Sequence, residues 1–200
     1  GTYNATSGIQ TQTGAVTVSG GTYTLGSNST IATLTIGSNG TFDLNGKNLT
    51  TTTFTNGGIL KLQGGETVST APNLQLGSTV VYTKTNGSVV VKDWSYYNLT
   101  LDGAGGTFMI PSDKVLGGTL TINAGVFDQG ARNITAPRIV IGSQGAWVNN
   151  STGDITVGNG GVTNNGYIRL DGSGVGPGND ADAIVIRSLS DGTQQAWAGS

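Results

Sequence analysis

Residues 22–50 read TYTLGSNSTIATLTIGSNGTFDLNGKNLT, and residues 107–135 read TFMIPSDKVLGGTLTINAGVFDQGARNIT. The two stretches match at a constant offset in the numbering, 85 (107 − 22), apart from one slip that is later undone. A second match relates residues 55–62 to residues 163–170 at an offset of 108 (163 − 55), which exceeds the first offset by 23 (108 − 85). Repetition interrupted by an insertion of about one repeat unit is typical of stacked-repeat proteins.

The repeat also places single residues in matching positions. Phe42 aligns with Phe127, and Asn48 aligns with Asn133. The two asparagines are each followed by an apolar residue and a threonine. We therefore expect both to lie at turns, with the side-chain amide bonded to backbone groups of its own or the adjacent coil.

The apolar residues follow a period of two, the pattern of half-buried strands. Asn-Gly pairs interrupt this pattern, and asparagine and glycine are the residues that most readily take a positive φ in a turn. The alternating segments are Leu34-Thr-Ile36, Leu60-Lys-Leu62, Leu74-Gln-Leu76, Leu99-Thr-Leu101, Leu120-Thr-Ile122, Ile139-Val-Ile141, Ile155-Thr-Val157, Ile168-Arg-Leu170 and Ile184-Val-Ile186.

The spacing of one strand type decides between a solenoid and a sandwich. A hairpin partner would return within about 8–12 residues. This strand instead returns in steps of 20, 20, 25, 21 and 19, at Leu34, Phe54, Leu74, Leu99, Leu120 and Ile139. Such steps leave room for three short strands and three turns. The sequence therefore predicts an all-β fold, a right-handed parallel β-helix with about 20–25 residues per coil. We expect one segment over residues 1–200, part of a longer protein.

Stacking of equivalent positions predicts which side chains form the core. Truncating one of them should be costly, because each packs on its neighbours one coil away. The predicted inward residues are Leu34, Ile36, Phe42, Leu44, Leu60, Leu62, Leu99, Leu101, Leu120, Ile122, Phe127, Ile139, Ile141, Ile168 and Leu170.

Composition narrows the classes of partner. Charged residues make up 10% of the chain and the net charge is −2, too weak a balance to predict nucleic acid or an anionic membrane as a partner. The absence of cysteine and histidine removes thiol nucleophiles, histidine acid–base chemistry and the usual transition-metal ligands. No apolar run approaches the roughly 20 residues of a membrane helix, so no membrane insertion is expected in this segment.

A resemblance follows from Tyr97-Asn-Leu-Thr-Leu101, Gly118-Thr-Leu-Thr-Ile122 and Asn133-Ile-Thr135. These runs resemble the repeats of large bacterial surface proteins, in particular the solenoids of filamentous-haemagglutinin-type adhesins and autotransporter passengers. The resemblance implies an extracellular or cell-surface protein whose solenoid acts as stalk, spacer or binding surface. Its expected partners are further solenoid coils, copies of itself stacked end to end, and surface glycans. The resemblance brings no catalytic motif.

Catalysis is the first alternative, because parallel β-helices include polysaccharide lyases and hydrolases that use clustered carboxylates. Asp43 and Asp128 recur with the repeat, which indicates a scaffold role at a turn, and no catalytic residue or cofactor is predicted. Asp180 and Asp182 lie two residues apart in a glycine-rich stretch resembling one unit of the calcium-binding nonapeptide repeat. They are the candidate calcium ligands, although an ordinary polar turn also accounts for them.

Two further surface features suggest binding. Alternation from Leu99 predicts that Tyr97 points inward and that Trp94 and Tyr96 point outward, where two rings could stack on a glycan, cover the side of the solenoid or meet another subunit. Rows of outward threonines could also order water, as in ice-binding solenoids, although threonine is simply a favoured strand residue. The predicted rows are Thr33/Thr35, Thr53/Thr55, Asn73/Gln75, Asn98/Thr100 and Thr119/Thr121.

The leading hypothesis is therefore a non-catalytic structural or adhesive module of a bacterial surface protein or filament. A carbohydrate-binding or carbohydrate-active β-helix is the alternative, and an ice-binding solenoid ranks below both.

Overall fold

A computed structural model describes residues 2–4, 10–149, 151–170 and 184–186. Within these residues the chain contains strands and no helix, so no helix is long and apolar enough to cross a membrane. The strands are β1 (Thr2–Asn4), β2 (Gln10–Thr24), β3 (Ser29–Asp43), β4 (Leu49–Asn56), β5 (Ile59–Leu62), β6 (Asn73–Leu74), β7 (Thr79–Tyr82), β8 (Gly87–Val90), β9 (Asn98–Met109), β10 (Lys114–Val115), β11 (Thr119–Asp128), β12 (Ile134–Asn149), β13 (Ile155–Asn164), β14 (Tyr167–Leu170) and β15 (Ile184–Ile186).

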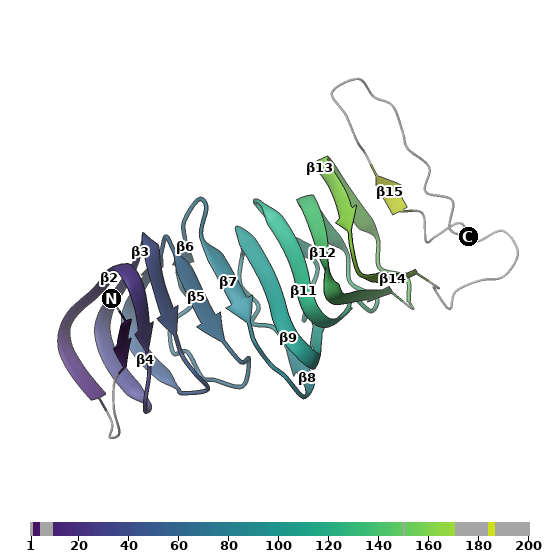
Figure 1. The fold of residues 1–200 in the computed structure, drawn as a ribbon. Coiled ribbons are helices and arrows are strands. Elements are labelled where there is room, and N and C mark those ends of the chain that lie inside the picture. The colour runs from purple at the N-terminus through teal and green to yellow at the C-terminus, as the bar shows by residue number, and fades with distance from the viewer. Residues whose placement is uncertain (1, 5–9, 150, 171–183, 187–200) are drawn as a thin grey trace, which may run out of the picture.

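The strands pair in parallel, each with its equivalent one coil away, and the coils stack into a β-solenoid of about 8 turns (Figure 1). Phe42 pairs with Leu60, and Ile139 pairs with Val162. The step in numbering from coil to coil is thus 18 (60 − 42) at the first pair and 23 (162 − 139) at the second. The predicted fold class is confirmed.

Long strands run around the corners of a coil. In β12, residues 134–136 pair with β13, residues 138–141 pair with both β11 and β13, and residues 146–149 pair with β14. At one such corner Gly145 lies under the preceding coil, where a Cβ atom would overlap the carbonyl oxygen of Ile122. Glycine is needed there because the two backbones approach too closely for any side chain.

The core consists of columns, meaning sets of inward side chains that lie one above another in successive coils. One column runs through Phe42, Leu60, Val80, Leu99, Leu120 and Ile139, all fully buried. A second contains Val89, Phe108, Phe127 and Trp147. Every predicted core residue is at most 1% exposed except Ile168, which is partly buried, and Leu170, whose side chain lies outside the described residues.

The two matching stretches occupy different faces of the solenoid. The column of Phe42 passes through Leu120, whereas Phe127 lies further along the same strand and pairs with Phe108. The offset between the two stretches is therefore not a whole number of coils. The strands of different faces share one local pattern, so sequence similarity alone does not distinguish the faces.

The strand series predicted from Leu34 to Ile139 also passes from one face of the solenoid to another. Leu34 pairs with Phe54, but Leu99 pairs with Val80 and not with Leu74, which accounts for the one long step in the series. Leu76, two residues after the end of β6, is 84% exposed, although alternation placed it on the same face as Leu74, which packs against the core.

The threonine rows divide accordingly. Thr33 and Thr35 pair with Thr53 and Thr55 on one face, whereas the row of Thr119 and Thr121 lies on another. There Thr119 pairs with Arg138, and Thr121 pairs with Thr100 and Val140. The predicted outward positions therefore belong to two faces and not to one series, and the second row meets Arg138.

Replacement of Leu99 by alanine should lower the free energy of unfolding by about 2–5 kcal/mol, because the cavity lies between two neighbouring layers of the column. Leu76→Ala is the matched control. Its side chain is exposed, and its effect should stay within about 0.5 kcal/mol. Urea denaturation followed by circular dichroism measures both, and equal effects would contradict the stacked core.

Candidate functional site

Strand pairing is interrupted on two faces of the solenoid near its middle. The pairings of β5, β7 and β9 are continuous, but among the described strands β6 pairs only with β4, β8 only with β9, and β10 only with β12. Residues 91–97, between β8 and β9, form no strand. This stretch, called here the interrupted segment, contains the aromatic cluster recognised in the sequence.

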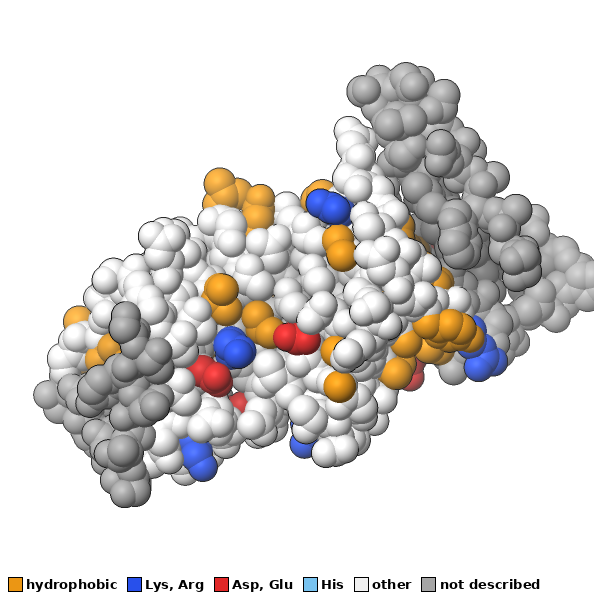
Figure 2. All heavy atoms as spheres, viewed as in Figure 1, with side chains coloured by type: hydrophobic (Ala, Val, Ile, Leu, Met, Phe, Trp, Pro, Cys, Tyr) orange, Lys and Arg blue, Asp and Glu red, His pale blue; other side chains and the backbone are white. Residues whose placement is uncertain are grey.

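A hollow of about 300 Å³ opens beside the interrupted segment. Two successive coils build it, one through residues 93–95 and the next through residues 112–115. Its lining residues are Asp93, Trp94, Ser95, Ser112, Asp113, Lys114 and Val115. On the face shown in Figure 2, charged side chains are few and scattered over a largely uncharged surface.

Lys114 takes an inward position that an apolar residue holds in the next two coils. It pairs with Ile134, which pairs in turn with Ile155. The side chain of Lys114 is 7% exposed, and its ammonium group forms an ion pair with the carboxylate of Asp93. It also donates to Ser112 Oγ at 2.8 Å. A buried ammonium needs such partners, because an unpaired charge in this position would be strongly destabilising.

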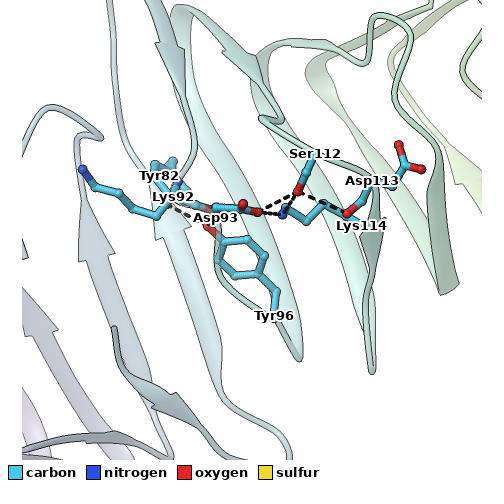
Figure 3. A network of polar contacts seen from close by, with 7 residues as sticks. All are labelled: Tyr82, Lys92, Asp93, Tyr96, Ser112, Asp113 and Lys114. Atoms are coloured by element: carbon cyan, nitrogen blue, oxygen red, sulfur yellow. Dashed lines mark hydrogen bonds and ion pairs between the residues drawn. The ribbon is translucent and has the colours of Figure 1, made fainter. Parts of the chain in front are cut away.

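Asp93 is held by the same cluster from the solvent side. Ser112 Oγ donates to Asp93 Oδ1 at 2.7 Å, and the three side chains converge in Figure 3 while Lys92 extends away from them. The hydrogen bond from Lys114 is the main cause that lowers the pKa of Asp93 below its ordinary value, and the Ser112 hydroxyl adds to it. The carboxylate therefore stays ionised and acts only as a hydrogen-bond acceptor.

Asp113 faces the following coil. Its carboxylate accepts hydrogen bonds from the backbone N–H of Asn133 at 2.9 Å and from Asn133 Nδ2 at 3.1 Å. Asn133 Oδ1 accepts in turn from the backbone N–H of Asp154, at 2.8 Å. Asp113, which lines the hollow, and Asn133 thus link three successive coils.

Asn48 makes the equivalent bonds nearer the N-terminus. Its Oδ1 accepts from the N–H of Thr67 at 2.8 Å, and its own N–H donates to Asn28 Oδ1 at 2.9 Å. The predicted role of Asn48 and Asn133, bonding to the backbone of an adjacent coil, is confirmed.

Tyr96 points inward, contrary to its predicted outward position. It is 3% exposed, and its hydroxyl donates to the Lys92 carbonyl at 2.6 Å. The Tyr82 hydroxyl accepts from the Lys92 N–H at 2.8 Å and lies 2.9 Å from the Tyr96 hydroxyl. Because the one proton of Tyr96 goes to the carbonyl, Tyr82 must donate to Tyr96, which closes a ring of three hydrogen bonds. Burial is the main cause that raises the pKa of both hydroxyls.

Trp94 keeps part of its predicted exposure. Its ring is half-buried on the wall of the hollow and packs against Tyr96, with ring centroids 6.4 Å apart and planes tilted by 51°. Tyr97, predicted inward, is half-buried. Alternation failed here because it requires an extended strand, and residues 91–97 are not in one. A buried Tyr96 cannot stack on a glycan, so only Trp94 remains of the predicted pair.

Sequence reasoning missed two buried charged residues, Lys114 and Glu66. Lys114 and Leu116 lie two residues apart, as inward residues of a strand do, and this spacing was the available signal. Glu66 is 2% exposed, and its carboxylate accepts backbone N–H groups of Gly46, Gln63 and Gly64 at 2.6–3.1 Å. No local pattern predicts this turn.

In the part of the chain that the structure describes, no three acidic residues gather as a metal site would require. The candidate calcium ligands Asp180 and Asp182 lie outside the described residues.

The fold and the hollow together define the class of this protein as a parallel β-solenoid whose described residues include the interrupted segment. No family model, curated protein or solved structure matches the chain.

Tyr82→Phe should lower the free energy of unfolding by about 1–3 kcal/mol, because it leaves the partly buried N–H of Lys92 without an acceptor. Tyr97→Phe removes a hydroxyl that forms no hydrogen bond within the described residues, and it should change stability by less than about 0.5 kcal/mol. Chemical denaturation of the two variants tests the ring, and equal losses would contradict it.

Asp93→Asn should lower the unfolding midpoint more at about pH 6 than at about pH 3. The folded pKa of Asp93 lies below the unfolded value of about 3.9, so its contribution is present above that value and is lost as the pH falls through the folded pKa. Asp154→Asn, whose side chain makes no hydrogen bond within the described residues, is the control. A midpoint difference for Asp93→Asn that does not change with pH would refute this assignment.

Proposed function

We propose that this chain is a non-catalytic structural module of an extracellular bacterial surface protein, a rigid spacer that continues end to end with further coils or with copies of itself. The observation that carries the proposal is the set of side-chain bonds between coils. Asn28, Asn48, Asp113 and Asn133 each accept a backbone N–H of the following coil at 2.8–2.9 Å. These bonds reinforce the parallel backbone ladder.

Side-chain hydrogen bonds between successive coils are suited to a rod-shaped protein. Strands in a sheet are about 4.8 Å apart, so about 8 coils give a rod about 40 Å long. Each further coil would add length without a new core, because a repeat contacts only its neighbours. The resemblance of the repeats to adhesin solenoids supports the extracellular setting.

The ion pair between the buried Lys114 and the exposed Asp93 supports the same function. Lys114 neutralises Asp93 and is enclosed by it and Ser112, so both charged groups already contribute to joining two coils. In a lyase or hydrolase such groups would instead be expected to face the scissile bond.

The mechanical role is tested by pulling single molecules from their two ends. Asn133→Ala removes bonds to the coils on both sides. It should lower the force of one unfolding step, and it should lower the free energy of unfolding by about 1–2 kcal/mol. Thr121→Ala, a half-buried outward residue with no side-chain hydrogen bond among the described residues, should leave the force unchanged.

An assay for polysaccharide cleavage tests the competing class. Release of reducing ends or of unsaturated uronates from pectate, xylan or β-glucan, abolished by Lys114→Met, would overturn the proposal. So would an unfolding force that Asn133→Ala does not change. Sedimentation over a range of concentrations would show whether copies join end to end.

A further inference from the structure

The hollow at the interrupted segment has a composition suited to one kind of ligand. We propose that it binds a neutral pyranose ring of a glycan chain, with Trp94 as the stacking surface and Asp93 as the hydrogen-bond acceptor. This inference goes beyond the spacer function and does not depend on it.

Trp94 supplies a fixed apolar wall. Its ring packs on Tyr96, whose hydroxyl is tied to the Lys92 carbonyl, so the indole is held from behind while it lines the hollow. Val115, 73% exposed, adds a second apolar surface among the lining residues. The C–H face of a pyranose is apolar, and aromatic rings offer it a large contact area at low entropic cost.

Asp93 supplies the polar contact. Its Oδ1 is engaged by Lys114 and Ser112, whereas its Oδ2 has no hydrogen-bond partner within the described residues. The side chain is 65% exposed. An ionised carboxylate only accepts hydrogen bonds, so its complement is a group rich in donors, such as adjacent sugar hydroxyls. The hydroxyl groups of Ser95 and Ser112 also line the hollow.

The charge balance selects neutral sugars over acidic ones. Asp93 and Asp113 carry two negative charges, and Lys114 carries one positive charge. That positive charge is buried and already paired with Asp93, so it is not free to bind a uronate or a phosphate. An acidic ring would meet a net negative site, where like charges repel. The volume of about 300 Å³ is at the lower limit of ligand pockets and suits a short portion of a chain.

The test uses ¹⁹F NMR of the whole chain labelled with 5-fluorotryptophan. The probes are cellohexaose, laminarihexaose, xylohexaose and mannohexaose, with hexagalacturonate as the acidic counterpart. At least one neutral probe should shift the Trp94 resonance in a saturable way, while the resonance of Trp147, buried in the core, should not move. The Trp94 resonance is assigned from its loss in Trp94→Phe.

Variants distinguish the contribution of stacking on Trp94 from that of hydrogen bonding to Asp93. Because both Trp94 variants lose the reporter resonance, their binding is measured by isothermal titration calorimetry with the same probes. Trp94→Ala should weaken binding by about ten-fold or more, and Trp94→Phe should weaken it less while keeping the wall intact. Asp93→Asn should also weaken binding, and Val90→Ala, at an exposed residue that does not line the hollow, should not. Thermal denaturation shows whether each variant is folded, and Trp94→Phe decides the question if Trp94→Ala does not fold.

Three results would overturn the inference. These are no Trp94 shift with any neutral probe, an equal or stronger response to hexagalacturonate, or binding that survives both Trp94 variants unchanged. None of them affects the spacer function, whose tests use Asn133 and not the hollow.

Discussion

Parallel pairing between coils is the constraint on which this structure depends. Each strand that the structure describes bonds to strands one coil before or one coil after it, so the environment of a residue is determined by residues about twenty positions away. Phe127 lies between Phe108 and Trp147 for this reason. The same constraint explains glycine at the corners, where a Cβ on Gly103 or Gly145 would overlap a carbonyl oxygen of the coil before.

Buried polar and charged side chains gather where the parallel pairing between coils is interrupted. In the interrupted segment the backbone leaves the ladder, and side chains take over the bonds that strands would make. The ring formed by Tyr82, Lys92 and Tyr96 satisfies the partly buried backbone groups of Lys92, and Lys114, paired with Asp93, fills a position that is apolar in later coils. A hollow can form there because the coil is not required to follow its neighbours closely.

The sequence predicted the coils and their core well, but it did not predict on which face of the coil each strand lies. Alternation and the twenty-residue step identified the solenoid and nearly all of its core, and the matching of Asn48 with Asn133 identified an inter-coil bond. The faces could not be distinguished, because a strand and turn look alike on every side of the coil. Tyr96 was misplaced for a different reason, since its position depends on the hydroxyl of Tyr82, fourteen residues earlier, and on no local pattern. For the site, the sequence predicted Trp94 and missed Lys114.

The likeness of the faces has a geometric consequence. Phe42 and Phe127 belong to equivalent sequences but lie in different columns, so an insertion need not contain a whole coil to be accommodated. Adding one strand and one turn upstream would leave the packing rules satisfied and rotate everything downstream about the long axis by one face. The direction in which Trp94 is presented, relative to whatever precedes the solenoid, is therefore a property that short insertions and deletions can set in discrete angular steps.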